Sequence, residues 1–158
     1  MAAGSFTTDI TAIRERARQK MADGPVTGSY GKDPEEVITV LNEVLATEIV
    51  CWMRYTRHAI SATGINRAQV ADEFTEHAES ERGHAMLAAE RISQLGGEPD
   101  FDPATIAERA HTTYETYPDG DLEGMLRDNL TAERIVITTY QEIIRWLGER
   151  RPDHAQAS

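Results

Sequence analysis

Acidic residues stand at apolar positions in three long helical segments of this 158-residue chain. In each segment, apolar residues recur at alternating intervals of four and three, which is the period of the buried side of an α-helix. The period includes Glu48, Glu81 and Glu133, each at a position where a hydrophobic side chain is the usual choice. The chain is therefore expected to form an all-α bundle whose helices bring carboxylates into its interior.

Capping and breaking residues mark where these helices begin and end. Asp33-Pro34-Glu35-Glu36 combines a cap, a proline at the first helical position and an acid three residues after the cap. Gly64 and Gly96-Gly97 break the pattern after the first and second helices. The three long helices are thus predicted over about residues 33–62, 66–95 and 119–148.

The chain is predicted to hold one folded domain. Residues 1–32 form an N-terminal amphipathic arm and linker, with a short helix over residues 7–22, residues 33–148 form the helical domain, and residues 149–158 form a polar C-terminal tail. The arm is basic whereas the rest is acidic. We expect it to pack on its own bundle or on a neighbouring subunit rather than to bind nucleic acid.

The first two long helices are predicted to form an antiparallel hairpin with its turn near Gly64. Glu48 lies sixteen residues before Gly64 and Glu81 lies seventeen after it. At a rise of 1.5 Å per residue, both acids stand roughly 24–25 Å from the turn. Two interior carboxylates are therefore expected at one height.

Residues 96–119 form a connection that is longer than an adjacent antiparallel helix needs. Extended, it could reach past the length of the bundle, so we predict a crossover that brings the third long helix back parallel to the second. Glu133 lies about as far from the start of its helix as Glu81 does from its own. The third acid is therefore expected near the other two.

The amino-acid composition limits the kinds of molecule that the chain is expected to bind. The formal charge of −11 and the pI near 4.8 argue against nucleic acid or an anionic membrane and favour a cation. The single cysteine, Cys51, excludes an intrachain disulfide framework and a Cys-rich metal site, and it fits a reducing compartment. No apolar run is long enough to span a membrane and no signal-peptide core is evident, so a cytoplasmic protein is expected.

Three carboxylates in a dry interior repel one another and lose hydration, at a cost of several kcal/mol per ion unless positive charge matches them. Lys and Arg are missing from the central stripe positions of the first and third helices. A bound cation is the simplest compensation. Carboxylate oxygens with an imidazole suit iron or manganese, and zinc can occupy the same geometry.

With these residues identified, the chain resembles the ferritin-like superfamily, particularly bacterioferritin and Dps-like ferritins. The resemblance covers roughly residues 34–148 and rests on Glu48 with Leu41-Asn42-Glu43, on Glu81-Arg82-Gly83-His84, on Leu95-Gly96-Gly97-Glu98-Pro99 and on residues 125–133. It implies a ferritin-like antiparallel helix bundle with a carboxylate-bridged di-iron site. It also implies ferroxidase activity, in which Fe(II) is oxidised by dioxygen or hydrogen peroxide, and storage of Fe(III) in a homo-oligomeric shell.

The resemblance also assigns residues. Glu48 and Glu133 correspond to the single-Glu metal ligands, and Glu81 with His84 to one Glu-x-x-His pair, in which Glu81 bridges the two metals. Tyr55 matches a tyrosine that such sites place near the metals, although its interpretation as a core aromatic residue carries equal weight.

The chain also departs from this pattern. The family continues into a fourth helix with a second Glu-x-x-His, and no such segment follows Leu147, so the site looks incomplete in this chain. His77, one turn from Glu81, is a further candidate ligand. We expect the chain to self-associate and to bind iron more weakly than a complete site. Haem is not expected, because Arg82 stands where bacterioferritin has its haem-ligating methionine, and His58 and His111 are interpreted as surface or loop residues.

Two alternatives remain open at the level of sequence. One is a non-catalytic helical oligomer, or a degenerate ferritin relative, in which the acids are protonated or hydrogen-bonded. The other is a different carboxylate-bridged di-metal enzyme. A rubrerythrin-like version would need a Cys-x-x-Cys domain, which one cysteine cannot supply.

Overall fold

The computed structural model describes residues 8–19 and 31–149, and every described element is a helix. The elements are α1 (Ile10–Gln19), α2 (Pro34–Ser61), α3 (Arg67–Gln94), α4 (Ile106–Arg109) and α5 (Leu122–Gly148). The three predicted long helices are confirmed to within a few residues. The chain divides into two units, residues 1–30 and 31–158, so α1 and the bundle are described separately. The tail that includes His154 lies outside the described residues.

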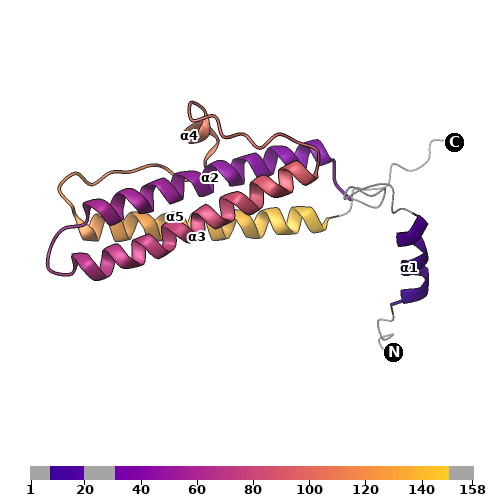
Figure 1. Cartoon of the computed structure of the whole chain (residues 1–158), viewed down its shortest axis with the longest axis horizontal. Coiled ribbons are helices and arrows are strands. Elements are labelled where there is room, and N and C mark those ends of the chain that lie inside the picture. Colours follow the sequence, from indigo (N-terminus) through magenta and orange to yellow (C-terminus); the bar gives the residue numbers. More distant parts are fainter. Residues whose placement is uncertain (1–7, 20–30, 150–158) are drawn as a thin grey trace. The chain divides into compact units, whose positions relative to one another are not determined.

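Helices α2 and α3 form the predicted antiparallel hairpin (Figure 1). The Asp33 side chain caps α2 by accepting a hydrogen bond from the Glu35 backbone amide at 3.1 Å. Gly64 supplies the turn with a positive φ of 95°, which a side chain would strain. The two helices pack through two apolar clusters, one shared with α5 around Tyr55 and Phe74 and a larger one shared with α4. The buried members of the larger cluster are Leu45, Ala46, Ile49, Val50, Ala85, Ala88, Ala89, Ile92 and Ile106.

The connection between α3 and α5 crosses over as predicted, so that α5 runs in the same direction as α3 (Figure 1). It contains the short helix α4, which the sequence pattern did not predict, and it lies along α2. Thr63, just after α2, donates a hydrogen bond to the carbonyl of Gly120, just before α5, at 3.1 Å. This contact starts α5 beside the end of α2 and sets the two helices antiparallel.

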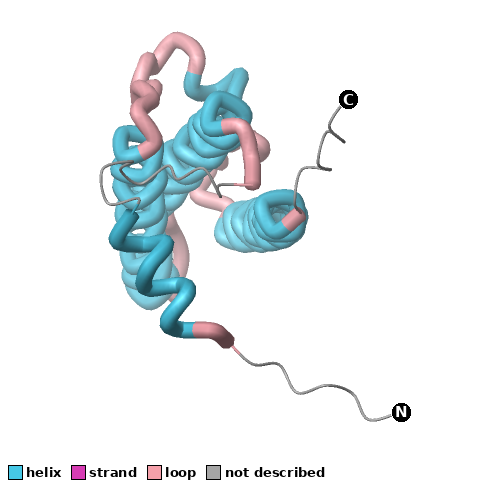
Figure 2. The backbone as a smooth tube through the Cα atoms, turned by 90° about the vertical axis from the view of Figure 1, so that its right-hand side faces the viewer, coloured by secondary structure: helices cyan, strands magenta, loops and turns pink. Residues whose placement is uncertain are grey.

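The apolar stripe of α5 is largely exposed within the described chain. The buried residues of α5 are Met125, Asn129 and Ala132, which belong to a neighbouring stripe of the helix. Leu126, Leu130, Ile137 and Ile144 are 50–67% exposed. Helix α5 meets α2 and α3 at few points, among them Met125, which packs with Tyr55, Phe74 and Ala78. In the described part of the chain, nothing covers the opposite side of α5 (Figure 2).

Among the helices of residues 8–19 and 31–149, none combines the length and the apolar character needed to cross a membrane.

Candidate metal centre

Three of the predicted ligands converge halfway along the α2/α3 hairpin. One ligand atom each from Glu48, Glu81 and His84 lies within 4.8 Å of the others. His84 Nδ1 is 3.1 Å from Glu81 Oε2 and 3.5 Å from Glu48 Oε2. The equal distances of the two acids from the turn therefore do place them at one height, as the sequence spacing predicts.

The two carboxylates of this cluster are buried, and their charge is poorly matched. Glu48 is 1% exposed, and its Oε2 atom has no hydrogen-bond partner. Burial, followed by the adjacent Glu48 carboxylate, raises the pKa of Glu81 to about 8, and the hydrogen bond with His84 opposes this rise. Glu81 thus holds its proton near neutral pH. His84 opens the cluster to solvent, because its side chain is 54% exposed.

Tyr140 is a member of the site that the sequence pattern did not identify. The Tyr140 hydroxyl, on α5, donates a hydrogen bond to Glu48 Oε1. Burial, followed by the Glu48 charge, raises the pKa of Tyr140 above its usual range. Tyr140 therefore stays a donor and fixes the Glu48 carboxylate with its free Oε2 directed toward His84.

Glu133 lies beside this cluster rather than within it. Its side chain is 34% exposed, its Oε1 accepts a hydrogen bond from the Tyr55 hydroxyl at 2.7 Å, and it lies 3.9 Å from His77 Nδ1. Burial, followed by this hydrogen bond, raises the pKa of Tyr55 above its usual range. Tyr55 thus joins α2 to the third acid, while the role of Glu133 as a metal ligand stays a prediction.

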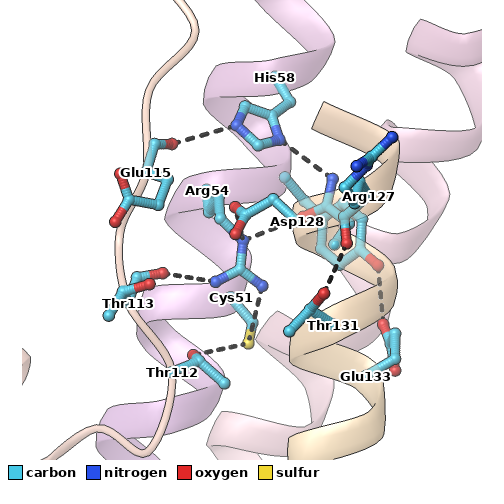
Figure 3. Close-up of polar contacts among 12 residues, drawn as sticks. Cys51, Arg54, His58, Thr112, Thr113, Glu115, Arg127, Asp128, Thr131 and Glu133 are labelled. Atoms are coloured by element: carbon cyan, nitrogen blue, oxygen red, sulfur yellow. Dashed lines mark hydrogen bonds and ion pairs between the residues drawn. The ribbon is translucent and has the colours of Figure 1, made fainter. Parts of the chain in front are cut away.

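The interior contains a cationic side chain, Arg54, that the apolar stripe pattern did not predict. Arg54 is 1% exposed and lies on α2 next to Tyr55. Its guanidinium donates to Asn129 Oδ1 at 3.0 Å and to the Thr113 carbonyl at 2.6 Å, and it lies 3.6 Å from Asp128 Oδ2 (Figure 3). Arg54 therefore compensates Asp128 rather than the carboxylates of the cluster.

His58 corrects a second expectation, because it is a fully buried residue of α2 rather than a surface or loop residue. Asn129 Nδ2 donates to His58 Nδ1 at 3.0 Å, and His58 Nε2 lies 3.1 Å from the Glu115 carbonyl, to which it donates (Figure 3). Burial lowers the pKa of His58, so the ring is neutral. His111 does lie in the crossover, 3.3 Å from Glu43 Oε2.

Comparison with known families decides the identity of this bundle. The sequence profile of the ferritin-like domain matches residues 38–157, which is most of the chain. The chain belongs to the ferritin family.

Two relatives of this ferritin-family chain are informative. The bacterioferritin-related protein from Bacteroides fragilis, described as a dodecameric thioferritin, is 35% identical, with a TM-score of 0.68 over 82% of this chain and 73% of that chain. A nutrient stress-induced DNA-binding protein from Synechococcus sp. is 27% identical over 115 residues, which is 70% of this chain and 64% of that protein. This chain thus spans less than two thirds of that curated relative. Because that relative is named a DNA-binding protein, the expectation that this chain has no nucleic-acid partner is not supported.

The donor set of this ferritin-family chain fits a divalent metal ion. Two carboxylates and an imidazole are ligands that iron, manganese and zinc accept. The buried Glu48 Oε2 atom has no hydrogen-bond partner, a state that costs about 1–3 kcal/mol or more for a charged group unless a ligand replaces the lost water. The cluster is therefore a candidate metal centre.

Proposed function

We propose that this chain binds Fe(II) at the Glu48, Glu81 and His84 cluster, oxidises it with dioxygen or hydrogen peroxide, and stores the Fe(III) product in a homo-oligomeric shell in the cytoplasm. The observation that carries this proposal is the convergence of two buried carboxylates and an imidazole, since one ligand atom each from Glu48, Glu81 and His84 lies within 4.8 Å of the others. Membership of the ferritin family supports iron as the cation.

Each residue has a role in this proposal. Glu48 and His84 hold one iron ion, Glu81 bridges two, and Glu133 is a ligand of the second. Tyr55 and Tyr140 orient Glu133 and Glu48 by hydrogen bonding. Each Fe(II) gives up one electron, so two ions and two protons reduce one hydrogen peroxide to water, and four ions with four protons reduce one dioxygen.

The net charge of −11 favours the entry of Fe(II), because an acidic surface raises the local concentration of cations. The exposed apolar side chains of α5 favour assembly, since contiguous apolar surface of this kind is rarely left in water. Sedimentation of the purified chain is expected to give an oligomer. A stable monomer at micromolar concentration would remove the shell from the proposal and leave the oxidation step standing.

The test of the oxidation step compares two double variants. We expect Glu81→Ala/His84→Ala to lower the initial rate of aerobic Fe(II) oxidation by at least about tenfold, because it removes two of the three converging ligands. The matched control is Glu79→Ala/Arg82→Ala, which removes an exposed ion pair from the same turns of α3. The control is expected to keep the parental rate.

Equal rates in the parent and in Glu81→Ala/His84→Ala would contradict the proposal. That result would favour the alternative of a non-catalytic helical oligomer whose carboxylates are only protonated or hydrogen-bonded.

A further inference from the structure

His58 lies where α2, the crossover and the first turns of α5 meet, and it is 0% exposed. Its two ring nitrogens bond different segments. Nε2 donates to the Glu115 carbonyl of the crossover at 3.1 Å, and Nδ1 accepts from Asn129 Nδ2 of α5 at 3.0 Å (Figure 3). One imidazole of α2 therefore bonds both of the segments that follow the hairpin.

Arg54 fixes the direction of the bond between Asn129 and His58. Its Nε donates to Asn129 Oδ1 at 3.0 Å, and a guanidinium has no acceptor atom and keeps its charge. Turning the Asn129 amide over would place its NH2 group against the guanidinium, donor against donor. Asn129 must therefore present its NH2 group to His58, and the facing ring nitrogen of His58 must carry no proton.

We propose that His58, Asn129 and Arg54 form an acid-sensitive switch, which holds the crossover and α5 on α2 while the imidazole is neutral and releases them when it is protonated. In an imidazolium both nitrogens are donors, so Nδ1 would meet the Asn129 NH2 group and their hydrogen bond would be lost. The inference goes beyond the proposed function, because it concerns the metal-free fold and does not require iron.

Groups on every segment packed against His58 face its ring. They are Arg54 and Arg57 of α2, Phe74 of α3, Glu115 and Tyr117 of the crossover, and Asp128 and Asn129 of α5. Burial is the largest influence and lowers the pKa of His58, and the two arginines act in the same direction. The Glu115 carbonyl and the Asp128 charge oppose them without reversing the result. The closed arrangement thus favours the neutral ring.

The direction of the pH dependence follows from this preference. In a released state the ring is hydrated and its pKa returns to about 6.5, above its value in the closed state. The closed state is therefore fully favoured above pH 6.5. Below it the released state binds a proton that the closed state does not, so the ratio of released to closed molecules rises by up to about tenfold per pH unit.

Helix α5 is the element that this switch can move, because it meets α2 and α3 at few points. The same helix carries Glu133, which accepts from Tyr55 of α2, and Tyr140, which donates to Glu48 of α2. Release of the first turns of α5 in acid therefore loosens the support that α5 gives to the carboxylates of the candidate metal centre.

Hydrogen exchange of the full chain in the presence of a chelator, at about pH 7 and about pH 5 and corrected for the intrinsic effect of pH on exchange, tests the switch. The informative variant is His58→Gln, whose side chain accepts from Asn129 and donates to the Glu115 carbonyl but does not titrate. The amides to follow are those of the first turns of α5 and of Gly120, which bonds the Tyr117 carbonyl at 2.9 Å.

In acid, the protection of these amides should fall at least about threefold more in the parent than in His58→Gln. The matched control His111→Gln changes a crossover histidine that pairs with Glu43, and it should behave as the parent does. An equal fall in the parent and in His58→Gln, or no fall in the parent, would overturn the switch.

Asn129→Asp tests the same switch from its other side. A carboxylate can accept from the Arg54 guanidinium and from an imidazolium at once, so the variant should keep these amides protected in acid. A loss of protection in Asn129→Asp equal to that of the parent would show that the direction of the Asn129 amide does not control release, and it would overturn the inference.

Discussion

At the scale of single residues, the centre depends on how a buried carboxylate is satisfied. Glu48 has one oxygen bound by Tyr140 and the other without a hydrogen-bond partner. A buried charge in this condition destabilises the fold until a cation or a proton reaches it. In the absence of a cation, Glu81 carries a proton near neutral pH, because its pKa is about 8.

Replacing Tyr140 by Phe tests this view of Glu48. The change removes the hydrogen bond to Oε1 and leaves both oxygens of a buried carboxylate without a partner, so the metal-free protein should lose about 1–3 kcal/mol of unfolding free energy. Urea denaturation in the presence of a chelator measures this loss. The control Tyr114→Phe, at an exposed position of the crossover, should change little. Equal stability of the parent and Tyr140→Phe would contradict the role of Tyr140.

The burial of His58 predicts that the free energy of unfolding depends on pH. The fold lowers its pKa below the value of about 6.5 expected in the unfolded chain. As the pH falls through 6.5, His58 is protonated in the unfolded chain but stays neutral in the native state. The contribution of His58 to the free energy of unfolding is therefore present above pH 6.5 and is lost below it. Between pH 7 and 5, the parent should lose up to about 1.4 kcal/mol per pH unit more than His58→Gln. Parallel stability profiles for the two proteins would contradict this assignment.

The residues that were predicted and those that were missed differ in a physical way. Glu48, Glu81 and His84 could be predicted because each breaks an apolar stripe, and the spacing from one turn fixes their height. Arg54 and His58 could not, because their burial depends on the crossover and on α5 covering them. The contribution of Tyr140 depends on how far α5 sits from α2, which no periodicity reports.

At the scale of helices, the crossover is part of the core rather than a passive connection. Arg54 of α2 bonds the crossover through the Thr113 carbonyl and bonds α5 through Asn129. Asn129 in turn reaches His58, whose ring bonds the Glu115 carbonyl of the crossover (Figure 3). This network joins three segments through polar groups, where an apolar interface would carry no directional preference.

Replacing Arg54 by Lys tests this joint. A lysine keeps the charge but cannot donate to Asn129 and to the Thr113 carbonyl in the fixed geometry of a guanidinium, so a loss of about 2–4 kcal/mol in unfolding free energy is expected. Hydrogen exchange should show the loss first in the crossover amides. The control Arg57→Lys, one turn along the same helix, should leave both measurements near the parent. Unchanged protection of the crossover in Arg54→Lys would show that the network does not hold it.

The direction of α5 was predicted from the length of residues 96–119, whereas its buried side was not. Periodicity identifies an apolar stripe but cannot say which neighbour covers it. Met125, Asn129 and Ala132 are buried on the side that meets the other long helices, while Leu126, Leu130 and Ile137 remain open to solvent. The helix therefore has one side engaged in its own bundle and one available for assembly.

At the scale of the whole molecule, the bundle brings acids from three helices to its middle and leaves one side of them accessible. Glu48 and Glu81 are buried, whereas His84, His77 and Glu133 border solvent. The acidic composition surrounds this opening with a charge that favours cations. Such an arrangement offers oxygen and nitrogen ligands on a side that a divalent ion can reach.

Anomalous X-ray scattering from crystals soaked anaerobically with Fe(II) tests the central claim most directly. We predict an iron peak within bonding distance of Glu48 Oε2, Glu81 Oε2 and His84 Nδ1, the three atoms that converge in the metal-free structure. The absence of an iron peak at these three atoms at saturating Fe(II) would contradict it.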